Sequence, residues 1–438
     1  MQNYILKIKN KITEYLTILR GRFDFSRTRE ISTQPIREIK NGQKAIIDSL
    51  KCPYCFSQKF VRRGFRPKKL EKVQLYLCLE CGRSFTAQIT KGKHYPLEAI
   101  FEGVSLYNLG YSLEESCRIL QQHHNYNIQP TSLSNWLAEF ADNCRFLRMR
   151  EYAVKKYSPK DMVITATLAH RQLYRYRFHQ AKCELMIQEE FQHRKFTPLQ
   201  EFLQMVPVEC PHQYFQEGLR ASETPLTFSK KQMIVRAKQN YATKLAAFVL
   251  QSVKERKLRH EALQKFMLYN DSVTVATEVP VYLTKDDLEH MQTQLGFIIY
   301  HKSLASLPRD TVPEVGSVVA GDAEIAKDLP KLITGHIDIL QIRNGQIHLL
   351  DYKSEAEKER PVEQLTLYAM ALSRLTGLRL FEFKCAWFDE KDYFEFYPLH
   401  VLHKPRKTQR RRKVYTMEGV YQVNKNPDKL ERIRPISL

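Results

Sequence analysis

The stretch from residue 335 to 368 constrains the fold most, because two short apolar runs, a turn and an amphipathic helix follow one another there. The apolar runs are Ile337, Ile339 and Ile342, then Ile347, Leu349 and Leu350. The segment Arg343-Asn344-Gly345-Gln346 separates them, and Asn-Gly favours the tight turn of a β-hairpin. This stretch therefore predicts two antiparallel strands followed by a helix.

Two carboxylates and a lysine fall on this predicted hairpin. Asp338 lies in the first strand and Asp351 at the end of the second, so the hairpin can bring them together. Lys353 follows two residues later and points to the same side as Asp351. Converging carboxylates repel one another unless a cation lies between them, and oxygen ligands favour Mg²⁺ or Mn²⁺, which suit phosphodiester hydrolysis. The alternative is a hairpin with ordinary exposed charges, since Asp-x-Lys is a common pattern.

Further motifs surround the hairpin at characteristic spacing. Gly335 and Asp338 form a Gly-x-x-Asp strand, Gln364 and Tyr368 lie one helical turn apart, and KLRHEAL places His260 before Glu261. Together, over about residues 240–400, these motifs resemble the RecB-like branch of the PD-(D/E)XK nuclease superfamily.

This resemblance implies a role for each matching residue. His260, Asp338, Asp351 and the Tyr352 carbonyl would bind Mg²⁺ or Mn²⁺. Lys353 would be the catalytic lysine, with Gln364 and Tyr368 supporting the site. Asp351 stands where many members have Glu. Some members hold an iron–sulfur cluster, but only Cys385 follows Tyr368 here, so we expect no such cluster.

The net charge of the chain points to a polyanionic partner. The 438 residues carry 69 Lys and Arg against 48 Asp and Glu, a formal charge of +21, with 11% aromatic residues. This composition favours nucleic acid, and a membrane surface is the alternative. The first twenty residues resemble a basic amphipathic helix and lack the apolar core of a signal peptide. No later stretch is apolar enough for a membrane span, so we expect a soluble cytoplasmic protein.

A pair of Cys-x-x-Cys motifs predicts a structural metal site. Cys52 and Cys55 form one pair, and Cys78 and Cys81 form the other, with 22 residues between the pairs. Four thiolates suit a closed tetrahedral Zn²⁺ site, whereas a redox pair needs only one motif. The segment between the pairs is basic and strand-like. Its Arg62 and Arg63 are expected to contact DNA phosphates, or the segment is a solvated hairpin.

Helical signals follow over residues 93–150. Ser112 and Glu115 form a capping box, a turn follows near 125–130, and Leu133, Trp136, Leu137 and Phe140 then share one helix face. Two short helices joined in this way suit a helix-turn-helix, and the alternative is a plain helical hairpin. In the first interpretation three residues bind DNA: Ser132, Ser134 and Asn135.

The order of these N-terminal motifs is similar to the DNA-binding region of insertion-sequence transposases, over about residues 48–145. The acidic triad of a transposase is not recognisable afterwards. Residues 151–239 read as a basic, aromatic-rich connecting region instead. Its Arg171, Arg175 and Arg177 alternate with aromatic residues, which fits either strand stacking on nucleic acid or an ordinary strand with a basic face. The scattered histidines, including His170 and His212, are not expected to be ligands.

From residue 240 the pattern fits an αβββαβ plan. One long helix is expected to carry His260 near its end. The strand SVTVATEVPVYL contains Glu278, which is expected to face solvent, and the alternative is that it helps the site. Strands near 379–398 close the core. The tail 401–438 is basic and is expected to attract phosphate through five residues: Lys404, Arg406, Arg410, Arg411 and Arg412.

These patterns predict an α+β multidomain protein. Its parts are a basic N-terminal helix and linker (1–44), a zinc ribbon (45–92), a helix-turn-helix segment (93–150), the connecting region (151–239), a restriction-endonuclease-like core (240–400) and the tail. The predicted function is metal-dependent DNA cleavage in a mobile-element, recombination or repair setting, together with other proteins of such a setting. A paired cut would favour a homodimer. The alternatives are a DNA-binding protein with a retained nuclease fold and an active transposase.

Overall fold

The computed structural model describes residues 51–67, 70, 72–86, 93–228, 234–237, 240–253, 255–301, 328–402, 412–416, 419–423 and 430–432. All of the described residues belong to one compact unit of the chain, which begins at residue 51. The expected N-terminal amphipathic helix and linker, residues 1–44, lie outside the described residues.

A small three-stranded antiparallel sheet carries the four N-terminal cysteines. Its order is β1 (Phe60–Pro67), β2 (Lys72–Cys78) and β3 (Ser84–Thr86). The rings of Phe60, Tyr76 and Phe85 contact one another with centroids 5.3 to 5.6 Å apart. The small apolar core of this sheet therefore consists of aromatic rings packed edge to face and face to face. The expected strand-like segment between the cysteine pairs is confirmed as β1 and β2.

Four helices follow: α2 (Leu97–Asn108), α3 (Leu113–His124), α4 (Pro130–Glu139) and α5 (Leu147–Lys156). The Ser112–Glu115 capping box begins α3 as predicted, with both reciprocal hydrogen bonds at 3.1 Å. Asn125 ends that helix in the left-handed conformation at φ 56°. The apolar face expected on α4 is buried.

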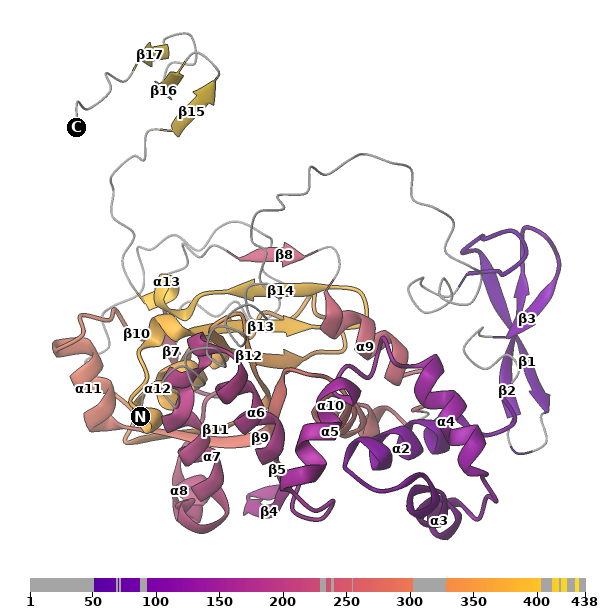
Figure 1. Ribbon diagram of the computed structural model, residues 1–438. Helices are drawn as coiled ribbons and strands as arrows, with labels where there is room; N and C mark the ends of the chain where they lie inside the picture. Colours follow the sequence, from indigo (N-terminus) through magenta and orange to yellow (C-terminus); the bar gives the residue numbers. More distant parts are fainter. Residues whose placement is uncertain are drawn as a thin grey trace, which may run out of the picture. The chain divides into compact units, whose positions relative to one another are not determined.

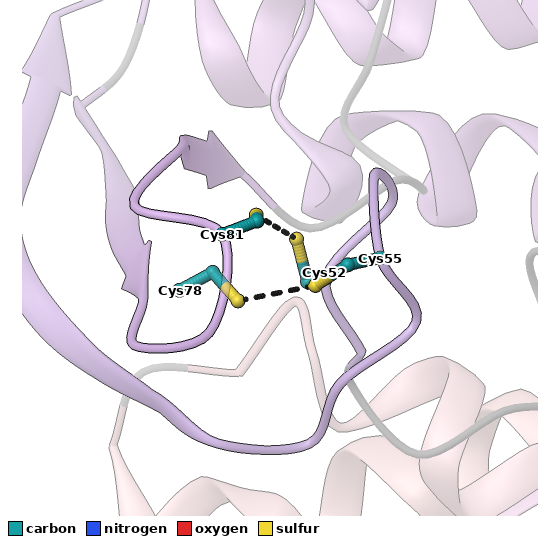
Figure 2. Close-up of side chains that lie close together, drawn as sticks. All are labelled: Cys52, Cys55, Cys78 and Cys81. Carbon is teal, nitrogen blue, oxygen red and sulfur yellow. Dashed lines mark hydrogen bonds between the residues drawn. The ribbon is translucent and has the colours of Figure 1, made fainter.

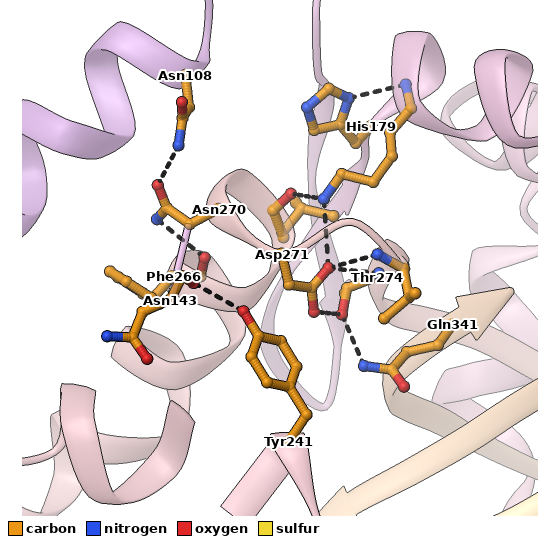
Figure 3. Close-up of polar contacts among 12 residues, drawn as sticks. Asn108, Asn143, His179, Tyr241, Phe266, Asn270, Asp271, Thr274 and Gln341 are labelled. Atoms are coloured by element: carbon orange, nitrogen blue, oxygen red, sulfur yellow. Dashed lines mark hydrogen bonds and ion pairs between the residues drawn. The ribbon is translucent and has the colours of Figure 1, made fainter. Parts of the chain in front are cut away.

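The helical segment packs on the following domain. The Asn108 amide on α2 donates to the Asn270 side chain on α10 (Arg259–Asn270) at 2.8 Å (Figure 3). The Asn270 amide also donates to the Ser105 hydroxyl at 2.9 Å. The Phe101 ring contacts Phe248 and Phe266, with centroids 4.6 and 5.4 Å apart. Buried hydrogen bonds and aromatic contacts thus join α2 to the domain that follows.

A nine-stranded mixed sheet forms the centre of that domain (Figure 1). Its order is β4-β5-β9-β11-β12-β13-β14-β8, with the short β6 added beside β11. The strands span Ile164–His170 (β4), Gln172–Phe178 (β5), Leu219–Arg220 (β6), Val235–Ala237 (β8), Thr274–Thr284 (β9), Leu332–Arg343 (β11), Gln346–Tyr352 (β12), Phe383–Phe388 (β13) and Tyr393–Phe396 (β14). Residues 151–239, expected to connect two domains, therefore contribute strands to this sheet.

The predicted αβββαβ plan is present as α10, β9, β11, β12, α12 (Val362–Thr376) and β13. Strands β9, β11 and β12 are antiparallel neighbours, and α12 crosses over so that β13 runs parallel to β12. Helix α12 is largely buried and forms part of the main hydrophobic core. The expected hairpin turn is confirmed, because Asn344 and Gly345 both have positive φ, 53° and 69°.

The expectation of one long helix before β9 is wrong. The segment forms α9 (Tyr241–Val249) and α10, separated by the short 3-10 helix η3 (Arg256–Leu258). The Ser252 hydroxyl donates to the Val249 carbonyl at 2.7 Å and satisfies the end of α9. The polar residues after it offer no apolar face to continue the helix. His260 consequently lies in the first turn of α10.

Further elements surround the sheet: α6 (Gln180–Glu189), η2 (Phe191–Phe196), α7 (Thr197–Glu209), α8 (His212–Glu217), β7 (Leu226–Thr227), α11 (Lys285–Thr293), β10 (Tyr300–His301), η5 (Leu380–Glu382) and α13 (Pro398–Leu402). In the tail, β15 (Arg412–Thr416), β16 (Gly419–Val423) and β17 (Leu430–Arg432) form an antiparallel sheet. None of the helices in the described ranges has the length and apolar character needed to cross a membrane.

Candidate active site

Three carboxylates lie at one level across three neighbouring strands. The β11–β12 register pairs Ile339 with Leu350, which places Asp338 opposite Asp351. The β9–β11 register pairs Ile337 with Val279 and Ile339 with Thr277, which likewise places Glu278 opposite Asp338. Residues opposite one another on neighbouring strands project to the same face of the sheet. The sheet therefore gathers these carboxylates by its register.

Two cationic side chains accompany the carboxylates. His260 Nε2 lies 2.9 Å from Asp338 Oδ2, and Lys353 Nζ lies 2.9 Å from Asp351 Oδ2. Burial opposes a charge on His260, but Asp338 outweighs it and raises the pKa of His260 to about 9. Burial alone would raise the pKa of Asp338, yet the His260 charge holds that pKa below its usual range. One ion pair is thus well formed.

The negative charge of Asp351 is not fully compensated by the side chains around it. Burial and the nearby Asp338 charge raise the pKa of Asp351 well above its usual value, despite the contact with Lys353. In the described part of the chain, His260 Nε2, Asp338 Oδ2 and Asp351 Oδ2 are buried and make no hydrogen bond beyond their ion-pair contacts. A divalent cation would relieve this repulsion, and carboxylate oxygens with one imidazole fit Mg²⁺ or Mn²⁺.

Glu278 belongs to this cluster, so the expectation that it faces solvent is wrong. Ligand atoms of His260, Glu278 and Asp338 all lie within 4.8 Å of one another. Glu278 has a φ of 52°, which departs from the regular strand conformation. The Gln264 amide donates to its carboxylate at 2.6 Å. Burial and Asp338 raise the pKa of Glu278 to about 7.

The predicted supporting pair on α12 also reaches the site. The Gln364 amide donates to the Tyr368 hydroxyl at 2.7 Å. The Tyr368 ring lies so close to Gly335 that a Cβ there would be 2.2 Å from Cε1 of the ring. The glycine of the Gly-x-x-Asp strand thus leaves room for the tyrosine. The Tyr352 ring contacts the His260 ring edge to face, with centroids 5.8 Å apart.

A cavity of about 440 Å³ opens beside the carboxylates, and His260, Glu278, Asp338, Gln364 and Tyr368 are among its lining residues. Its other walls carry basic residues: Arg175, Arg177, Arg220 and Lys257. These cations make the cavity suited to a phosphate-containing ligand. The sequence did not connect them to the site, because they come from strands and turns far from the hairpin.

Glu261 pairs with two of these arginines. Its Oε1 atom lies 3.2 Å from Arg175 and 2.8 Å from Arg177. The Arg177 side chain is only 6% exposed, whereas that of Arg175 is 65% exposed. Arg177 therefore serves in a partly buried ion pair, and Arg175 remains accessible to a ligand. Arg171 donates to the backbone carbonyls of Gln216 and Gly218 and fixes a turn.

The four N-terminal cysteines come together at the end of the small sheet (Figure 2). Cys52 and Cys81 have sulfur atoms 3.5 Å apart, and Cys55 and Cys78 have theirs 3.4 Å apart. Sulfur ligands of a tetrahedral zinc ion lie about 3.7 Å apart, so small shifts would accommodate the ion. A hydrogen bond from the backbone at Cys81 lowers the pKa of the Cys78 thiol to about 7, which favours a thiolate.

The residues expected to bind DNA differ in their exposure to solvent. Ser134 and Asn135 are exposed on α4, and Ser132 is half-buried. Arg62 and Arg63 are exposed on β1, and Arg63 also donates to the Ser84 hydroxyl at 2.9 Å. In the tail, Arg412 begins β15, and the other four lie outside the described residues: Lys404, Arg406, Arg410 and Arg411.

Comparison with known families gives one match. A model of the PD-(D/E)XK nuclease superfamily matches residues 209–432, which is just over half of the chain. No curated protein and no solved structure matches the chain. The matched segment contains the whole carboxylate cluster together with strands β9, β11 and β12 that position it. The chain belongs to the PD-(D/E)XK nuclease superfamily.

Proposed function

We propose that the protein is a metal-dependent DNA nuclease that hydrolyses phosphodiester bonds. The observation that carries this proposal is the alignment of Glu278, Asp338 and Asp351 on adjacent strands, with Lys353 2.9 Å from Asp351. Membership of a superfamily whose fold is of the nuclease type supports it. The basic residues around the cavity match the charge of the proposed substrate.

Each residue of the cluster has a chemical task in this proposal. Asp338, Asp351, His260 and the Tyr352 carbonyl are the proposed ligands of Mg²⁺ or Mn²⁺, and Glu278 is added to them by its position. The bound cation supplies Lewis-acid activation of water and neutralises charge at the phosphate. Lys353 Nζ, held by Asp351, orients the attacking water and stabilises negative charge that develops on the phosphate oxygens.

Gln364 and Tyr368 act as positioning residues. Their hydrogen bond places the tyrosine ring against Gly335, three residues before Asp338. The ring therefore helps to hold in place the part of β11 that carries Asp338. Arg175 and Lys257 bind flanking phosphates at the rim of the cavity.

We also propose that the N-terminal modules bring the nuclease to DNA. The four cysteines bind a structural zinc ion, which holds the β1–β3 module folded as a zinc ribbon. Helices α3 and α4 act as a helix-turn-helix with Ser134 and Asn135 exposed towards DNA. The similarity of the motifs to the RecB-like branch and to transposase DNA-binding regions supports a mobile-element, recombination or repair setting.

A second candidate is a DNA-binding protein that keeps the nuclease fold without cleavage. The intact set of Asp338, Asp351 and Lys353 argues against it, because a binding scaffold has no need of buried, repelling carboxylates. A third candidate, a transposase, would require a separate acidic triad and a strand-joining activity.

The test compares cleavage of end-labelled single- and double-stranded DNA with Mg²⁺, Mn²⁺ or chelator. Wild-type protein is expected to cut only with metal. Lys353→Ala is expected to bind DNA normally but cut far more slowly, while the exposed Lys160→Ala serves as the matched control. If wild-type protein binds DNA but leaves it intact with each metal, the binding-protein interpretation replaces this one.

A further inference from the structure

A third group of side chains that could hold a metal ion lies away from the carboxylates and the four cysteines. His170 ends β4, Cys210 follows α7 directly, and His212 begins α8. Ligand atoms of these three residues all lie within 4.8 Å of one another. His170 and His212 were not expected to be ligands from the sequence, but the fold brings them together from positions 42 residues apart.

The orientation of His170 is fixed on two sides. Its ring stacks on Phe215, with centroids 4.0 Å apart and an interplanar angle of 10°. Its Nδ1 atom lies 2.8 Å from His336 Nε2 on β11. This contact leaves Nε2 of His170 directed at the other two residues, 2.9 Å from His212 Nδ1 and 3.8 Å from Cys210 Sγ.

These distances suit a tetrahedral cation. Zinc binds nitrogen at about 2.0–2.1 Å and sulfur at about 2.3 Å, so its ligand atoms lie about 3.3–3.7 Å apart. The His170–His212 separation is a few tenths of an ångström shorter than this range and the His170–Cys210 separation slightly longer, so small side-chain shifts would accommodate the ion. Two imidazoles and a thiolate also exclude Mg²⁺ and Ca²⁺ as preferred ions, because those bind oxygen. We propose that His170 Nε2, Cys210 Sγ and His212 Nδ1 bind a zinc ion.

The surroundings of the group match this assignment. His170 is 2% exposed and His336 is 8% exposed, so the contact between them is a buried one that sets the orientation of a ligand. Cys210 is partly exposed and His212 is exposed, which leaves the fourth coordination position open to solvent. The site is thus accessible to the ion from one side.

A zinc ion here would join separate parts of the fold. It would tie the end of β4 to the α7–α8 turn, and α8 leads into Gly218, whose Cβ position would lie 2.7 Å from the Thr334 side chain on β11. His170, Phe215 and His336 also line the cavity beside Asp338. The ion would therefore stabilise one wall of that cavity without contacting the carboxylates.

The test measures zinc by mass spectrometry in the full-length protein, with Mg²⁺ in excess to compete for the carboxylates. The double variant Cys78→Ser/Cys81→Ser removes the four-cysteine site as a source of signal. This background is expected to retain one zinc ion per chain, which is lost when Cys210→Ser or His212→Ala is added. Matched substitutions outside the group, Cys117→Ser and His290→Ala, are expected to leave the zinc content unchanged.

A spectroscopic measurement distinguishes loss of ligands from loss of fold. With Co²⁺ in the same background, the expected spectrum contains a sulfur-to-cobalt charge-transfer band that disappears in Cys210→Ser but persists in His290→Ala. Since His212 is exposed, His212→Ala is expected to keep the circular dichroism of the parent protein. The proposal is overturned if the background binds no zinc, or if Cys210→Ser and His212→Ala bind as much zinc as the background.

Discussion

Asp338 lies opposite Asp351 on the neighbouring strand of the hairpin, and each carboxylate has its own cationic partner, His260 and Lys353. Burial opposes the negative charge on both acids, but their neighbours differ. The His260 charge lowers the pKa of Asp338, whereas burial together with the Asp338 charge raises the pKa of Asp351. A pair of this kind is suited to a divalent cation and unfavourable without one.

Glu278→Gln is expected to reduce metal-dependent cleavage by roughly 10- to 100-fold, the range typical when a metal site loses one supporting group. The reason is that the amide keeps the size of the side chain and its contact with Gln264 but removes the negative charge beside Asp338. Initial cleavage rates at several Mn²⁺ concentrations provide the measurement. The exposed Glu201→Gln on α7 is the control. Equal cleavage rates for the two variants would show that Glu278 does not take part in the metal-dependent reaction.

Gly335→Ala is expected to lower the free energy of unfolding by about 1–3 kcal/mol, because the new methyl group overlaps the Tyr368 ring. Urea unfolding of the single variants and the double variant with Tyr368→Ala forms a double-mutant cycle. The cost of Gly335→Ala should be smaller when Tyr368 is absent. An equal cost in both backgrounds would show that the close contact with Tyr368 is not its cause.

Lys182 is expected to make stability depend on pH in the alkaline range. Burial lowers its pKa from 10.5 to about 8, partly offset by Asp271, whose carboxylate lies 3.5 Å away in the network of Figure 3. Between pH 8 and 10.5 the unfolded chain therefore holds a proton at this lysine that the folded chain has lost. Stability due to Lys182 should rise with pH across that window, by at most about 3 kcal/mol, and stay constant below pH 8.

The measurement for Lys182 is the difference in free energy of unfolding between wild type and Lys182→Met from pH 7 to 10.5. Other titrating groups cancel in this difference. It should move in favour of the wild type as pH rises, whereas the same difference for the exposed Lys160→Met should stay flat. If the difference in free energy of unfolding instead moves against the wild type as pH rises, folding raises the pKa of Lys182 and does not lower it.

Arg62→Ala is expected to weaken DNA binding to a similar extent for every DNA sequence, because β1 exposes this side chain where it can contact phosphate but not necessarily bases. The slope of log affinity against log salt concentration should fall by about 1. Fluorescence anisotropy at several salt concentrations measures it, with the exposed Arg379→Ala as control. An unchanged slope would show that Arg62 on β1 does not contact DNA phosphate.

Local chemistry explains which features could be predicted from the sequence. The Asn344–Gly345 turn sets the hairpin register, so the meeting of Asp338 and Asp351 followed from two neighbouring segments. The Ser112–Glu115 capping box and the buried face of α4 are similarly local. The αβββαβ order could be predicted because each helix and strand in it has a recognisable hydrophobic periodicity.

Long-range and irregular features could not be predicted in this way. Glu278 joins the site by the pairing of β9 with β11, and its positive φ is an irregularity that the sequence of β9 does not signal. Arg177 meets Glu261 across 84 positions, and β4 and β5 join a sheet whose other strands lie mostly after residue 219. Sequence spacing carries no information about such contacts.

The most direct test of the central claim is cleavage of end-labelled duplex DNA with Mn²⁺ by Asp351→Asn, compared with wild type and with the exposed Asp286→Asn. DNA binding is measured on the same samples. The metal-dependent nuclease assignment predicts that Asp351→Asn binds DNA as tightly as wild type but loses cleavage by at least about 100-fold, while Asp286→Asn retains it. Cleavage by Asp351→Asn at the wild-type rate would contradict the assignment of these carboxylates as the catalytic centre.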